Sequence, residues 1–216
     1  MSVAVETRNT ADGRAALVRR GLRLNYLTIA YNALEAVVSI VAGLLAGSVA
    51  LVGFGADSVI EVTASGVAQW RLRADWDAER RERAERLTLR VVGWCFIALS
   101  AYVAYDSVTS LWLHEAPERS VAGIAILALS VVVMPLLARA KRRVARALRS
   151  AALESEATQT SLCAYLSGIA LAGVGLNALL GWWWADPAAA LVMVPIIARE
   201  GLEGLRGEPS CEDGCC

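Results

Sequence analysis

The sequence has few charged residues for its length. Charged side chains make up 19% of the 216 residues, whereas a soluble domain carries about 25%. Because hydrophobic residues account for 56%, this deficit favours a membrane protein. Net charge is absent as well, since 21 basic residues balance 21 acidic ones. That balance excludes a strongly basic nucleic-acid-binding protein, at least as a property of the whole chain.

Several kinds of site are also missing. The chain has a single histidine, and it contains no paired nucleophile and base and no glycine-rich phosphate loop. These absences weigh against an intramembrane enzyme, and we expect no prosthetic group.

The polar, arginine-rich first 22 residues lack the apolar core and cleavage site of a secretory signal. We therefore expect the first hydrophobic segment to be retained as a membrane span.

Six apolar stretches approach the roughly 20 residues that a membrane-spanning helix needs. They lie at about residues 24–46, 48–70, 89–113, 120–138, 156–180 and 183–197. Only Gly47 and Ser48 separate the first two, which predicts a tight helical hairpin. The sixth is short, and we expect it to continue as a helix beyond Ile197. The sequence thus predicts an all-α membrane protein, a bundle of six transmembrane helices.

The basic residues lie on one side of this predicted bundle. Twenty of them lie in the N-terminal arm, in the links 71–90 and 138–150, or after the sixth stretch, and Arg119 is the exception. The positive-inside rule then places both termini in the cytoplasm. We expect three parts: a cytoplasmic arm at 1–23, a six-helix domain at 24–207 and a cysteine-rich cytoplasmic tail at 208–216. Helix formers in both links predict helices that continue past the bilayer.

Acidic residues, in contrast, occur within or at the edges of the apolar stretches. An ionisable side chain near the bilayer centre costs at least about 2.5 kcal/mol, so such residues mark a site or a pathway. No Lys or Arg lies within the predicted spans to pair with them. We therefore expect these carboxylates to attract a cation or to share protons. They are Glu35, Asp57, Glu61, Asp106, Glu154 and Glu156.

The spacing of these residues predicts one site at the middle of the membrane. Asp57 and Glu61 are four residues apart and share one face of the second helix. Gln159 and Cys163 have the same spacing in the fifth helix, and three helices could converge their ligands. Carboxylates with a thiolate favour zinc, cadmium or similar ions over magnesium and calcium, which prefer oxygen alone. The candidate metal-binding residues are Asp57, Glu61, Gln159, Cys163, Glu156 and Glu35.

Structural roles are the alternatives for the same residues. Asp57 and Glu61 could be a protonated, hydrogen-bonded pair that stabilises helix packing. Cys163 could pack as a small buried hydrophobic residue, and Gln159 could form an interhelical hydrogen bond. The tail cysteines, Cys211, Cys215 and Cys216, could bind metal or could belong to a disordered segment.

Two motifs resemble the cation diffusion facilitator family of metal/proton antiporters. The segment GSVALVGFGADSVIEV at 47–62 is similar to the family's second span, in which an Asp-x3-Asp pair follows Gly-Ser-x-Ala-Leu. Asp57 and Glu61 fall on that acidic pair. The segment LRSAALESEATQTSLCAYLS at 148–167, placed by its distance to WADPAAAL, is similar to the family's fifth span. Gln159 and Cys163 fall on its two ligand positions. The resemblance extends from about residue 24 to residue 207.

The resemblance implies six helices, cytoplasmic termini, a tetrahedral metal site between the second and fifth spans, and homodimers in most relatives. Glu61, Gln159 and Cys163 depart from the commoner ligands, so Glu156 or Glu35 could complete the shell. We expect a short form without the family's C-terminal cytosolic domain, which puts dimerisation through that domain in doubt.

The sequence therefore predicts a multi-pass plasma-membrane transporter that is not an enzyme. We expect it to export a divalent transition metal, Zn²⁺ or a similar ion, from the cytoplasm by proton antiport. Its expected partners are metal ions, protons and the lipid bilayer, with no nucleic acid. The alternatives are a membrane metal sensor that uses the cysteine tail and an intramembrane metal-dependent enzyme.

Overall fold

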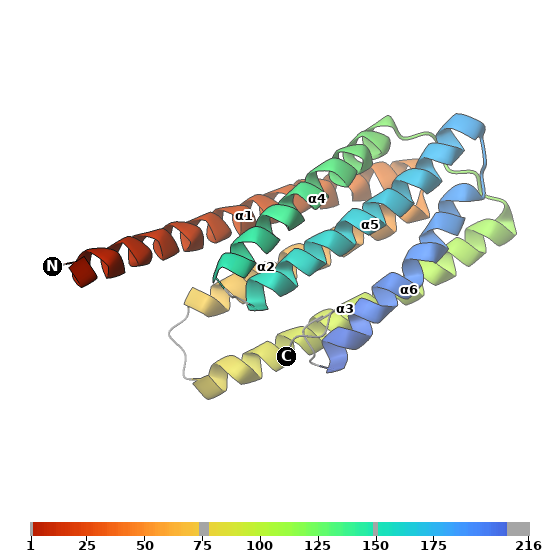
Figure 1. Cartoon of the computed structure of the whole chain (residues 1–216). Coiled ribbons are helices and arrows are strands. Elements are labelled where there is room, and N and C mark those ends of the chain that lie inside the picture. Colours follow the sequence, from red (N-terminus) through yellow and green to blue (C-terminus); the bar gives the residue numbers. More distant parts are fainter. Residues whose placement is uncertain (1, 74–77, 149–150, 207–216) are drawn as a thin grey trace.

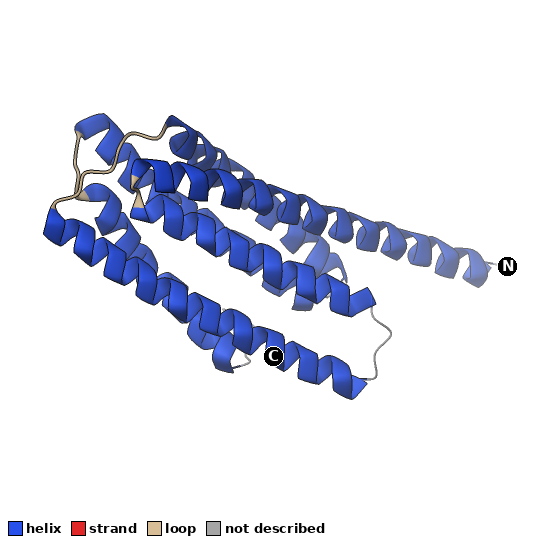
Figure 2. Ribbon diagram, turned by 180° about the vertical axis from the view of Figure 1, so that it is seen from behind, coloured by secondary structure: helices blue, strands red, loops and turns tan. Residues whose placement is uncertain are grey.

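The computed structural model describes residues 2–73, 78–148 and 151–206, and these form a bundle of helices (Figure 1). No strand occurs in these three ranges (Figure 2). The predicted all-α, six-helix architecture is confirmed. The helices are α1 (Ser2–Ala46), α2 (Val49–Arg73), α3 (Ala78–Leu113), α4 (Val121–Leu148), α5 (Ala151–Leu180) and α6 (Ala185–Arg206).

Within the described residues, five of these helices are long and apolar enough to cross a membrane. α6 is not among them, because its 22 residues include several charged side chains. It nevertheless runs along α3 through the bundle (Figure 1). As expected, α6 continues past Ile197, and α3 and α4 extend into the basic links. The N-terminal arm forms one helix with the first span, because α1 is unbroken from Ser2 to Ala46.

The helices form two groups that meet along α2 and α5. Contacts pair α1 with α2 and α4, and α4 with α5, whereas α3 pairs with α6. α2 and α5 both contact α6, and α2 also contacts α3. Side chains that α2 and α5 direct between the two groups are therefore enclosed from several sides.

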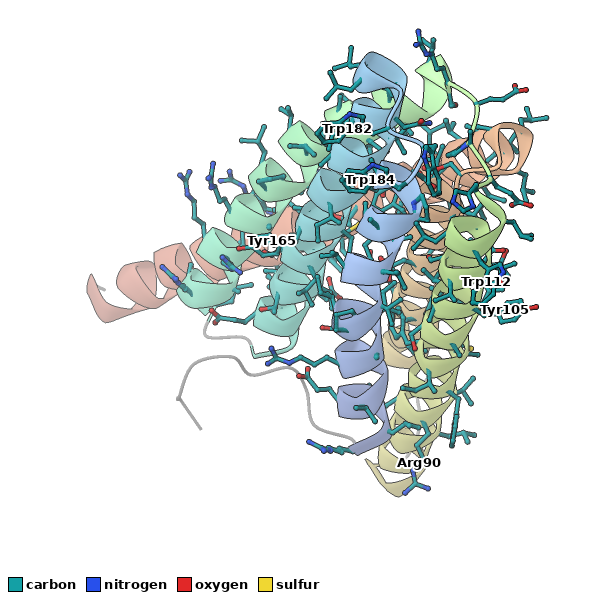
Figure 3. All side chains as sticks on the ribbon, turned by 90° about the vertical axis from the view of Figure 1, so that its right-hand side faces the viewer. Arg90, Tyr105, Trp112, Tyr165, Trp182 and Trp184 are labelled. Carbon is teal, nitrogen blue, oxygen red and sulfur yellow. The ribbon has the colours of Figure 1, made fainter. Side chains whose placement is uncertain are left out.

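The two ends of the bundle differ in composition. We call one end the basic end; there α2 ends, α3 begins, α4 ends and α5 begins (Figure 1). The opposite end, the tryptophan end, holds the connections 114–120 and 181–184. Trp182 and Trp184 stack there with ring centroids 5.2 Å apart, far from Arg90 on α3 (Figure 3). Tryptophan in such a position is typical of a membrane interface.

The predicted hairpin between α1 and α2 is confirmed, and a distant carboxylate stabilises it. Gly47 turns the chain with a φ of 64°, which glycine adopts at little cost. The Ser48 hydroxyl accepts a bond from the Leu51 N–H at 3.2 Å and so caps α2. Asp186 of α6 accepts bonds from the Ser48 hydroxyl at 2.5 Å and from the Val49 N–H at 2.9 Å. The Asp186 side chain is buried among these donors, with 1% of its surface exposed.

Replacing Asp186 by Ala should destabilise the bundle. The substitution leaves the Ser48 hydroxyl and the first N–H groups of α2 without their acceptor, a loss of about 1–3 kcal/mol. We expect a lower melting temperature for the purified protein in detergent, followed by tryptophan fluorescence. Glu115→Ala removes an exposed carboxylate at the same end and should leave the melting temperature unchanged. Equal melting temperatures for the two variants would contradict the capping role.

Candidate metal centre

Two residues of α2 and one of α5 form a compact cluster in the bundle. The ligand atoms of Asp57, Glu61 and Cys163 all lie within 4.8 Å of one another. Asp57 and Cys163 are buried, and Glu61 is half-buried. Two carboxylates and a thiol at these separations could bind one metal ion, since zinc takes oxygen and sulfur ligands at about 2.0–2.3 Å.

The cluster lies well inside the bilayer-spanning part of both helices. At 1.5 Å per residue, Asp57 is about 12 Å from the first residue of α2, and Glu61 follows one turn later on the same face. Cys163 is about 18 Å from the first residue of α5 by the same measure. The structure thus brings together these three side chains from α2 and α5.

The carboxylates of the cluster differ in their hydrogen bonding. Glu61 accepts a bond from the Asn32 side-chain amide at 2.8 Å. Asp57 is 4% exposed, and its Oδ2 atom is buried without a hydrogen-bond partner. Buried polar atoms in native proteins are nearly always paired. An unpaired carboxylate oxygen in a membrane protein therefore indicates a position that a cation or a proton fills.

Glu35 of α1 lies directly beside the cluster, in a shell of hydroxyl groups. It accepts hydrogen bonds from Ser58 of α2 at 3.1 Å and from Ser130 of α4. The Cys163 thiol points to the same carboxylate, with 3.7 Å between Sγ and Oε2. The structure thus brings this predicted candidate next to Cys163, although two hydroxyl groups already occupy its oxygens.

Gln159 lines a small cavity next to the cluster. The cavity measures about 20 Å³, and Asp57 and Glu61 form part of its wall. The wall also includes Glu200 of α6, which was not among the candidates. Glu200 follows Met193, Ile196 and Ile197 at helical spacing on one buried or half-buried face. That periodicity could have identified it, because the sixth helix was expected to continue beyond Ile197.

Glu156 lies apart from the cluster, in an ion pair. Its carboxylate is 3.5 Å from the Nζ atom of Lys141, which also bonds Asn25 at 3.4 Å and Thr160 at 3.3 Å. Lys141 is buried within the apolar span Val121–Leu148. The expectation that no basic residue lies in the spans to pair with the acids is therefore wrong. The burial of Lys141 could have been predicted from its spacing, because it lies three or four residues from Ala138, Val144 and Ala145, which are buried on the same face of α4.

Two further acids, within or at the edge of the predicted spans, take no part in the cluster. Asp106 is half-buried near the tryptophan end of α3, where it accepts a bond from Tyr102 at 3.4 Å. Glu154 is exposed. The tail residues Cys211, Cys215 and Cys216 lie outside the described residues.

Comparison with known proteins gives a family match and a similar curated protein. Residues 26–207 match a family described as the cation efflux transmembrane domain. The chain is also similar to the magnetosome protein MamB of Paramagnetospirillum magneticum (strain ATCC 700264 / AMB-1), at 29% identity over 171 residues. The matched region is 76% of this chain and 57% of the relative. The chain therefore spans little more than half the length of this curated relative.

The Lys141–Glu156 pair gives a direct test of how acids inside the bundle are neutralised. Lys141→Met should destabilise the protein by about 1–3 kcal/mol, because a partly buried carboxylate loses its cation. Adding Glu156→Gln to that variant should restore most of the loss, since no uncompensated charge remains. Thermal unfolding in detergent measures both effects.

An exposed ion pair provides the control for this test. Glu203 pairs with Arg199 at 2.8 Å on the surface of α6, and exposed pairs contribute roughly 0–1 kcal/mol. Glu203→Gln should therefore change stability little. If the double variant is no more stable than Lys141→Met, the pair is not the reason for burying Lys141.

Proposed function

The chain belongs to the cation efflux family, and from this premise we propose that it exports a divalent transition metal from the cytoplasm. The observation that carries the proposal is the cluster of Asp57, Glu61 and Cys163 inside the membrane-spanning bundle. Ionisable groups in such a position are expensive and are kept for ion or proton pathways. Membership of this family favours transport over the alternative of an intramembrane enzyme.

The chemistry of the cluster supports zinc, or a similarly soft ion such as cadmium, as the cargo. A thiolate with two carboxylates suits four-coordinate binding, and sulfur disfavours magnesium and calcium. The fourth ligand would come from Gln159, from Glu35 after a change of its hydroxyl partners, or from water. Glu156 is a weaker candidate because Lys141 already neutralises it.

Proton exchange follows from the same ligands. A carboxylate or thiol must lose its proton before it binds a metal ion, so loading releases protons and acid competes with metal. We propose that the ligands load metal from the basic end and take up protons from the tryptophan end. Protons moving inward would then reset the centre after each metal ion leaves.

The orientation of the bundle is part of the proposal. The positive-inside rule assigns the basic end to the cytoplasm and the tryptophan end to the outside, in the plasma membrane. Metal would then leave the cell at the end closed by the Asp186 cap.

Homodimer formation and metal capture by the tail cysteines remain predictions from the sequence.

Zinc transport should depend on the carboxylates of the cluster. In proteoliposomes, Asp57→Asn and Glu61→Gln should each lower zinc flux at least about tenfold, since each removes a charged ligand of the cargo. Glu115→Gln, which changes an exposed loop residue, serves as the matched control and should transport normally. Wild-type flux through correctly inserted Asp57→Asn protein would refute the site.

Proton release should accompany metal binding. Adding cadmium to the purified protein in weak buffer should release about one to three protons per bound metal. Cys163→Ser should release fewer, because the thiol proton is no longer displaced. Binding should also weaken as the pH falls. A pH-indicator dye measures the release, and metal binding without proton release would exclude exchange at these ligands.

A further inference from the structure

The cavity beside the metal centre has a carboxylate wall that the cluster does not explain. Its polar lining consists of Asp57, Glu61, Gln159 and Glu200, and the rest is apolar. A volume of about 20 Å³ suits one water molecule or one ion, since a single water needs roughly 10–15 Å³. Three acids in the wall of an otherwise mostly apolar cavity are unusual for a cavity that serves packing alone.

Among the cavity-lining residues of α6, Glu200 is the nearest to the basic end. It comes from α6 six residues before the helix ends at Arg206, whereas Asp57 lies deep in α2. The Glu200 side chain is half-buried, and it lines the same cavity as Asp57 and Glu61. A cation that approached from the basic end would therefore meet Glu200 together with Glu61 before it reached Asp57.

The orphaned Oδ2 atom of Asp57 is a separate sign of a ligand in this cavity. Asp57 lines the cavity, is 4% exposed and has no partner for this oxygen. A buried acceptor of this kind is satisfied by a donor or by a cation.

We propose that Glu200 is a further metal-binding residue, which takes up a divalent cation at the mouth of the cavity and passes it to Asp57 and Glu61. The inference rests on the proposed function. The cation exchanges a water ligand for a Glu200 oxygen, moves inward past Gln159 and then exchanges Glu200 for the ligands of the cluster. In the last step the oxygens of Asp57 and Glu61 and the sulfur of Cys163 replace Glu200 on the cation, and the protons that these groups carried are released to water. Glu200 thus raises the rate of loading, and the cluster determines the final affinity.

The same helix provides a matched control. Glu203 follows Glu200 by three residues, but it pairs with Arg199 at 2.8 Å and does not line the cavity. Neutralising Glu203 removes one negative charge from α6 without changing the cavity wall. Glu203→Gln therefore reports the effect of losing a negative charge on α6, whereas Glu200→Gln reports the loss of the proposed ligand.

The test follows cadmium loading at Cys163 in the full-length chain by stopped-flow absorbance of the cadmium–thiolate band. Cys163 is made the only thiol by four substitutions: Cys95→Ser, Cys211→Ser, Cys215→Ser and Cys216→Ser. In this background Glu200→Gln should slow association roughly 3- to 10-fold at low salt, as expected for the loss of an attractive charge on the approach path. Glu203→Gln should leave the rate unchanged, and Glu200→Asp should keep most of it.

The outcomes separate the two proposals. A full cadmium–thiolate band with an unchanged rate in Glu200→Gln would overturn the role of Glu200 and leave the metal centre standing. If Glu200→Gln has no band, Glu200→Asp decides: recovery of band and rate supports the role, and failure to recover overturns it. Absence of the band in the parent protein would overturn the proposed function, and this inference with it.

Discussion

The need to neutralise carboxylates away from water determines much of this structure. Each acid inside the bundle meets that need differently. Asp186 receives a hydroxyl and the first N–H groups of α2, Glu156 receives the ammonium of Lys141, and Glu35 receives hydroxyl groups. Asp57 differs, because one of its oxygens is buried with no partner. A mobile cation is the natural complement of such a group in a bilayer, so the exception among the acids coincides with the proposed metal centre.

The arrangement of the helices places this centre where access can change without loss of its ligands. Asp57, Glu61 and Cys163 all come from α2 and α5, whereas α3 and α6 supply one wall of the adjoining cavity. The Asp186 cap ties α6 to the start of α2 at the tryptophan end, whereas the cavity wall includes Glu200, six residues before α6 ends. Movement of the α3–α6 pair would therefore alter the path to the centre while the ligands stay together, as alternating access requires.

Periodicity explains what the sequence could predict. The i, i+4 spacing of Asp57 and Glu61 fixes a shared helix face, and a turn as short as Gly47–Ser48 permits only a hairpin. Periodicity within α4 and α6 indicates burial of Lys141 and Glu200, but the partners of Lys141 and Asp186 could not be predicted because they lie on other helices. Hydropathy assigned Lys141 to a solvent-exposed link, although α4 buries it against α5. Such pairings between distant segments become visible only once the helices are packed.

X-ray absorption at the zinc edge tests the central claim most directly, that two carboxylates and Cys163 bind one metal ion. The full-length chain would be loaded with one equivalent of zinc, with Cys163 as its only thiol. The account predicts one sulfur neighbour at about 2.3 Å together with oxygen or nitrogen neighbours at about 2.0–2.2 Å. It also predicts that the sulfur contribution disappears in Cys163→Ser. A shell of oxygen and nitrogen alone around zinc in the unsubstituted centre would contradict it.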